Sequence, residues 1–88
     1  MSLENELPLL PKPIAKLAWA AGCELARAME LHKPFNSAHE AYAVILEELD
    51  EFWEEVRKRR ESRSELAMRS ELVQIAAMAM RTIIDLNL

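Results

Sequence analysis

Residues 37–60 read SAHEAYAVILEELDEFWEEVRKRR, and this stretch decides the fold. Its apolar residues recur every three or four positions, which is the spacing of an amphipathic α-helix. Ser37 and Glu40 fit a capping box, in which the serine oxygen accepts from a backbone N–H and the glutamate reaches back. The run Arg57–Arg60 places cations at the negative end of the helix dipole. We therefore predict a helix here. Its apolar arc comprises Ala38, Ala41, Tyr42, Ile45, Leu49, Phe52 and Val56.

The segments on either side show the same periodicity. Apolar residues at helical spacing predict a first helix over 14–32, which stops at Lys33-Pro34. A third helix is predicted over 64–86, after a turn at 61–63. Gly22 is the only glycine, so strands and hairpins have few turn residues. The chain is therefore predicted to be all-α, with three helices.

The 88 residues are enough for one domain. Residues 1–13 carry three of the four prolines, which predicts an extended arm, and residues 14–88 form a single helical domain. The longest run without ionisable residues, 72–80, is much shorter than the roughly 20 residues of a membrane span. Cys23 has no second thiol to pair with, and no signal peptide is recognised. These features favour the cytoplasm and exclude a membrane partner.

Self-association is predicted from the distribution of apolar residues. A domain this small buries only roughly 60–65% of its surface, so a partner chain often stabilises it. The first predicted helix has a second apolar stripe, Trp19, Cys23 and Ala26. Between 72 and 84 on the third, only Gln74, Arg81 and Thr82 are polar. We expect a homodimer or a dimer of dimers. The net charge of −4 makes nucleic acid an unexpected partner.

Acidic residues on the second predicted helix fall on two sides. Glu48, Glu51 and Glu55 lie along the edge of the apolar arc, where like charges repel unless a cation lies between them. The third helix offers Glu71 and Gln74 at i and i+3. Oxygen ligands on facing helices suit Mg²⁺ or Mn²⁺. The alternative is a solvated acidic face with i, i+4 pairs. It would comprise Glu47, Asp50 and Glu54, with the pairs Glu54–Lys58 and Glu55–Arg59.

The order of these acids is similar to a family signature. Glu47-Glu48-Leu49-Asp50-Glu51 followed by Glu71-Leu72-Val73-Gln74 resembles the E-E-x-x-E … E-x-x-D pattern of MazG-type all-α nucleoside triphosphate pyrophosphohydrolases. His32-Lys33-Pro34 resembles the H-x-P turn that some members place before the acidic helix. The resemblance implies an oligomeric MazG-like helical bundle. It also implies hydrolysis of a (d)NTP between its α- and β-phosphates, which releases a monophosphate and pyrophosphate.

The resemblance also implies roles for individual residues. Glu48, Glu51 and Glu71 would be ligands of Mg²⁺ or Mn²⁺, and Gln74 would occupy the fourth ligand position. Glu47 would be an additional ligand or would orient the attacking water.

Arg81 and Lys58 are candidate substrate contacts. An internal salt bridge between Arg81 and Asp85 is the alternative for the first of them. For Lys58 the alternative is an ordinary cation-rich helix end.

Two departures from the family pattern favour a second hypothesis. Gln74 stands where the family has an aspartate, and an amide oxygen is a weaker, neutral ligand. The sequence also ends after the third predicted helix, whereas many members have a fourth that contacts the substrate. The alternative function is therefore a catalytically inactive MazG-like oligomeric binding or regulatory module.

Overall fold

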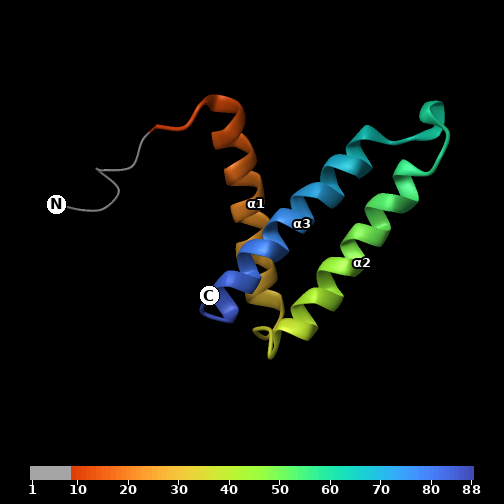
Figure 1. Cartoon of the computed structure of the whole chain (residues 1–88). Coiled ribbons are helices and arrows are strands. Elements are labelled where there is room, and N and C mark those ends of the chain that lie inside the picture. The colour runs from red at the N-terminus through yellow and green to blue at the C-terminus, as the bar shows by residue number, and fades with distance from the viewer. Residues whose placement is uncertain (1–8) are drawn as a thin grey trace.

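The computed structural model describes residues 9–88, which form three α-helices joined by short connections (Figure 1). The helices are α1 (Lys12–Leu31), α2 (Ala38–Val56) and α3 (Glu65–Asp85), and a single 3₁₀ turn (Arg60–Ser62) precedes α3. No strand occurs within residues 9–88. The all-α prediction is confirmed. Most of the predicted N-terminal arm, residues 1–8, lies outside the described residues.

The first helix begins earlier than predicted. It starts at Lys12 rather than Ile14, so Pro13 belongs to its first turn. Proline is tolerated there because the N–H groups of the first turn have no partner within the helix. The helix ends at Leu31, and His32 is already extended. Proline in the arm therefore marks the start of α1.

Serine side chains begin both α2 and α3. Ser37 Oγ accepts a hydrogen bond from Glu40 N at 3.1 Å, as the capping box predicts. The Glu40 carboxylate accepts instead from Asn36, through its backbone N at 3.4 Å and its Nδ2 at 3.1 Å. Half of the predicted box is therefore confirmed, and the other half is displaced by one residue. Ser64 Oγ caps α3 in the same way by accepting from Ala67 N at 3.0 Å.

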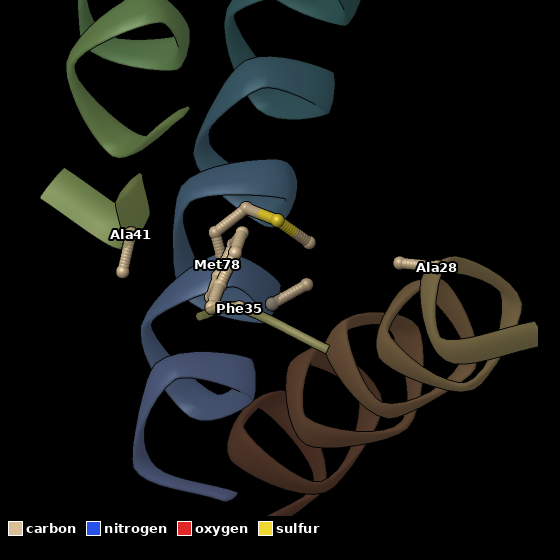
Figure 2. Close-up of a cluster of buried hydrophobic side chains, with 5 residues drawn as sticks. Ala28, Phe35, Ala41 and Met78 are labelled. Atoms are coloured by element: carbon tan, nitrogen blue, oxygen red, sulfur yellow. The ribbon is translucent and has the colours of Figure 1, made fainter. Parts of the chain in front are cut away.

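The last helix occupies the middle of the molecule. It packs against both α1 and α2, with α2 running antiparallel beside it and α1 crossing it on the other side (Figure 1). The buried core lies where the loop between α1 and α2 meets the C-terminal half of α3 (Figure 2). It consists mostly of small side chains, which let the helices approach closely. Its members are Ala28, Phe35, Ala41, Ala77 and Met78, with Leu25, Val44, Ile45 and Leu86 packed around them.

The apolar arc predicted for α2 is divided between two sides of the helix. Ala41 is buried and Ile45 packs on the core, whereas Tyr42 and Leu49 are exposed. Glu48 is half-buried. Of the seven members of the arc, Ala38, Tyr42 and Leu49 are therefore exposed in a single copy of the chain.

Large apolar side chains also remain exposed on the other helices. The second stripe of α1 includes exposed Trp19, Cys23 and Ala26. On α3, Leu72 and Ile84 are about half-exposed, so a single copy of the chain does not cover the whole apolar surface of this helix. A single copy leaves much of the apolar surface in water.

Candidate functional site

Three of the predicted ligand residues lie together between α2 and α3. Glu48 and Glu51 are at i and i+3 on α2, and therefore project from the same side of this helix. Glu71 projects toward them from α3, and one carboxylate oxygen from each residue lies within 4.8 Å of the other two. Glu48 and Glu71 are half-buried and Glu51 is exposed. We call these residues the acidic cluster. Its oxygens come from two helices, and a hard divalent cation prefers oxygen ligands of this kind.

The charges of the acidic cluster are not compensated by any ion pair within residues 9–88. Burial, followed by the neighbouring carboxyls of Glu71 and Glu51, raises the pKa of Glu48 to about 7. Hydrogen bonding to Glu71, together with charge repulsion, also raises the pKa of Glu51. Glu71 Oε2 is buried and has no hydrogen-bond partner among residues 9–88. A shared proton or a bound cation would relieve the repulsion between these carboxyls.

The acidic cluster lines a cavity of about 710 Å³ between the three helices. This volume lies within the range of small-molecule binding sites, roughly 300–1,000 Å³. Gln74 also lines the cavity, beside the acidic cluster. Arg27 of α1 and Lys33 of the following loop contribute cationic side chains, and Phe35 and Met78 contribute apolar ones. The cavity thus combines carboxylates, cations and an apolar wall.

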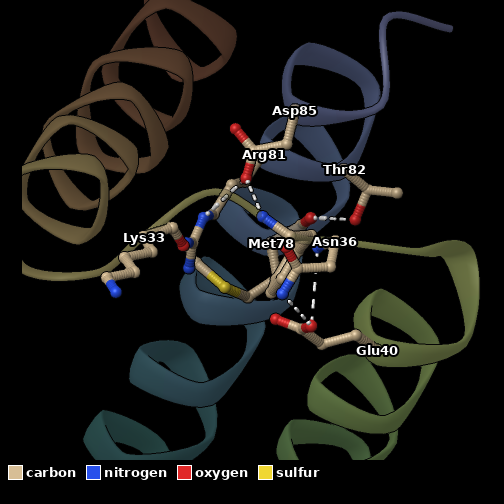
Figure 3. Close-up of polar contacts among 8 residues, drawn as sticks. Lys33, Asn36, Glu40, Met78, Arg81, Thr82 and Asp85 are labelled. Atoms are coloured by element: carbon tan, nitrogen blue, oxygen red, sulfur yellow. Dashed lines mark hydrogen bonds and ion pairs between the residues drawn. The ribbon is translucent and has the colours of Figure 1, made fainter.

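Arg81 attaches the loop between α1 and α2 to the central helix (Figure 3). Its Nε donates to Asp85 Oδ2 at 3.1 Å, and its Nη2 donates to the carbonyl oxygen of Lys33. Its guanidinium lies over the Phe35 ring, 4.2 Å from the centroid. Asp85 Oδ2 also accepts from Phe35 N at 2.9 Å. Arg81 lines the cavity, and its charge is already paired with Asp85, as the salt-bridge alternative anticipated.

Several other predicted residues lie outside the cavity. Glu47 is exposed and does not line it. Lys58, a predicted substrate contact, instead pairs with Glu55 at 2.9 Å near the C-terminal end of α2. Glu55 does not join the acidic cluster, because its carboxylate accepts from Ser64 N and so fixes the turn into α3. Its hydrogen bonds with Lys58 and Ser64 hold the pKa of Glu55 below its usual value.

Ion pairs at the end of α2 differ in spacing from those predicted. Glu54 pairs with Arg57 at 3.4 Å, and Glu55 pairs with Lys58, so both pairs are at i and i+3. The predicted partners, Lys58 and Arg59, lie beyond Val56, where α2 ends. Helical i, i+4 geometry does not extend to them.

Sequence reasoning did not single out Arg27 or Phe35 as site residues. Arg27 lies on a helix that has no acidic motif, and only the crossing of α1 over α3 brings it to the cavity. Phe35 follows Pro34 in a short interhelical loop. The presence of an aromatic residue in such a short loop was the one feature of the sequence that indicated a buried side chain there.

Comparisons of the chain with family profiles, with curated proteins and with solved structures found no significant match. Among residues 9–88, no helix is long and apolar enough to cross a bilayer. The functional interpretation therefore depends on the chemistry of the acidic cluster and the cavity beside it.

Proposed function

We propose that this protein is a Mg²⁺- or Mn²⁺-dependent nucleotide pyrophosphohydrolase of the MazG-like type. It would cleave a (d)NTP to the monophosphate and pyrophosphate. The observation that supports this most directly is the convergence of three carboxylates from two helices at a cavity of nucleotide size. The sequence resemblance of Glu47–Glu51 and Glu71–Gln74 to the family signature supports it independently.

The residues present fit a divalent cation. The buried Glu71 Oε2, which lacks a hydrogen-bond donor among the described residues, is an acceptor suited to one. Glu48, Glu51 and Glu71 would hold the ion, and Gln74 would offer a neutral amide oxygen. A bound divalent cation would neutralise phosphate charge and lower the pKa of the attacking water.

The other cavity residues have roles toward the nucleotide itself. Lys33 and Arg27 are the candidate cations for phosphate oxygens, because the pair of Arg27 with Glu24 is long and exposed whereas that of Arg81 with Asp85 is buried. Phe35 and Met78 supply apolar surface, which suits the base or the sugar better than a phosphate. Glu47 is exposed and outside the cavity, so a role in orienting the attacking water rests on the resemblance to the family signature alone.

The test is an assay with a panel of nucleotides and Mg²⁺ or Mn²⁺, in which pyrophosphate and phosphate are measured separately. Pyrophosphate release is expected from the natural chain. Glu48→Gln and Glu71→Gln should each abolish it, because a neutral amide binds the cation weakly. Helicity should be unchanged. Asp50→Asn is the matched control, since Asp50 is an exposed carboxylate on the same helix outside the cavity.

Two results would contradict the proposal. Undiminished turnover in both Glu48→Gln and Glu71→Gln would exclude these ligands. An equal loss of pyrophosphate release in Asp50→Asn would show that activity depends on the overall negative charge of α2 and not on the acidic cluster. A Glu47→Gln variant that keeps full activity would remove Glu47 alone from the mechanism.

The alternative is a catalytically inactive module of the same type. Gln74 favours it, because this cavity residue replaces the aspartate of the family signature with a weaker ligand. Such a module would bind cation or nucleotide without releasing pyrophosphate. Calorimetric nucleotide binding with no turnover over the whole panel would distinguish it from the enzyme.

Homodimerisation and a cytoplasmic location complete the proposal. Exposed large apolar residues on all three helices support self-association, including Trp19, Trp53 and Leu72. The single cysteine supports a reducing compartment.

A further inference from the structure

The helix α2 exposes a row of large apolar side chains on the side away from buried Ala41. Tyr42, Leu46, Leu49 and Trp53 are 67%, 40%, 44% and 57% exposed, respectively. Within α2 these four are the only large hydrophobic residues that are exposed, and all fall on one side of the helix. We call them the outer stripe. A contiguous row of this kind marks an interaction surface.

The spacing of the outer stripe is that of a coiled-coil seam. Its members are separated by four, three and four positions, which is the alternation of successive a and d positions in a heptad. The order is also the same in both directions: an aromatic residue, two leucines and an aromatic residue. The seam therefore has a midpoint of symmetry between Glu47 and Glu48.

We propose that the outer stripe is the interface between two copies of this chain, whose α2 helices pair antiparallel about a two-fold axis. In a two-fold interface, if residue i contacts residue j of the second copy, then j contacts i. The order of residue types meets this condition, because aromatic Tyr42 would lie opposite aromatic Trp53 of the second copy and Leu46 opposite its Leu49. A helix from an unrelated partner would need no such symmetry.

The flanks of the outer stripe also suit an antiparallel pair. On one flank, half-buried Ile45 and Phe52 continue the apolar surface toward the core. On the other flank, Asp50 would lie beside Ala43 of the second copy, and not beside another carboxylate. The pairing thus avoids like charges in direct opposition.

The proposed interface leaves the acidic cluster accessible. Glu48 and Glu51 project from roughly the opposite side of α2, toward the cavity. Each copy would retain a complete cavity. The inference shares self-association with the proposed function but does not rest on nucleotide hydrolysis, so the interface and the hydrolysis can each fail alone.

Sedimentation equilibrium at micromolar concentration tests the interface. The natural chain should have twice its 10.1 kDa mass. A Leu46→Glu/Leu49→Glu variant should have the monomer mass with unchanged helicity, because both leucines are already partly in water in a single copy. Leu66→Glu is the matched control, since Leu66 is 78% exposed on α3, and this variant should remain dimeric. A monomeric natural chain, or a double variant that still associates, would overturn the proposal.

Disulfide trapping tests the orientation without relying on the charged variant. Tyr42→Cys and Trp53→Cys are each made in a Cys23→Ser chain, which has no other thiol. Mixing the two variants under oxidation should give a covalent dimer, whereas each variant alone should give little. Efficient trapping of either variant alone, or none in the mixture, would overturn the antiparallel arrangement.

Discussion

At the residue scale, Glu48 connects the stability of the fold with the chemistry of the site. It is half-buried and lies within reach of two other carboxylates, so its charged form is disfavoured. A pKa of about 7 means that Glu48 still holds a proton at pH values where an ordinary glutamate is ionised. A cation that binds to Glu48 must displace this proton, so metal binding there depends on pH.

The first prediction at this scale concerns pH. In chelator, the free energy of unfolding should fall as pH rises from about 4.5 to about 7. In this window the folded chain binds more protons than the unfolded chain, because folding raises the pKa of Glu48, so raising the pH favours unfolding. Urea denaturation across the window measures the slope.

Glu48→Gln should flatten this slope, and Asp50→Asn should leave it unchanged. Some slope should persist in Glu48→Gln, because the pKa of Glu51 is raised as well. The lowered pKa of Glu55 acts in the opposite direction, but its contribution changes below the usual pKa of glutamate and so outside this window. Stability that rises with pH between 4.5 and 7 would refute the assignment of a proton to the acidic cluster.

At the scale of the elements, the connection between α1 and α2 is held by contacts with α3. Arg81 is 4% exposed and pairs with Asp85 on the same helix. It joins α3 to the carbonyl of Lys33 and to the ring of Phe35. These contacts place the loop against the central helix and so set the position of both outer helices.

Arg81→Met should therefore lower the free energy of unfolding by about 3 kcal/mol, because it leaves the buried carboxylate of Asp85 without its cation. Adding Asp85→Leu should recover only part of this loss, since Phe35 N would still lack an acceptor. Arg27→Met is the control. Arg27 has an exposed side chain at 3.9 Å from Glu24, so the change should be within about 1 kcal/mol. Equal effects of Arg81→Met and Arg27→Met in urea denaturation would contradict this account.

At the scale of the whole molecule, metal binding and folding should be coupled. The acidic cluster forms only when α2 and α3 lie side by side, so a cation that occupies it binds the folded state alone. Residues of α1, α2 and α3 all line the cavity. A ligand there would contact all three helices.

Mn²⁺ should therefore raise the melting temperature by several degrees, and Mg²⁺ by less, as seen by circular dichroism. At about 100 times its dissociation constant a cation stabilises the folded state by roughly 2.7 kcal/mol. Gln74→Asp should enlarge the shift and lower stability in chelator, because it adds a carboxylate beside the acidic cluster. Glu71→Gln should abolish the shift. If neither the natural chain nor Gln74→Asp responds to millimolar Mn²⁺, the pyrophosphohydrolase proposal should be abandoned.

The sequence by itself determined the features that depend on local interactions. The three helices, the serine cap at Ser37 and the placement of Glu48 and Glu51 on one side of α2 all follow from residue types and spacing within a few residues. Helix formation and capping depend on residues that are close in the sequence, so both can be predicted without knowledge of the tertiary structure. The pairing of Arg81 with Asp85 at i and i+4 belongs to the same class.

The side of each helix that is buried depends on packing between helices, which local spacing does not specify. Apolar periodicity on α2 was broad enough for two sides, and the structure buries the one with Ala41 and leaves Tyr42 and Leu49 in water. Close approach of α2 to α3 favours small residues at the contact, and Ala41 and Ala77 supply them. Periodicity measures how apolar a side is, whereas packing also selects for shape. The cations beside the acidic cluster were likewise fixed by the crossing of helices distant in sequence, which no local pattern encodes.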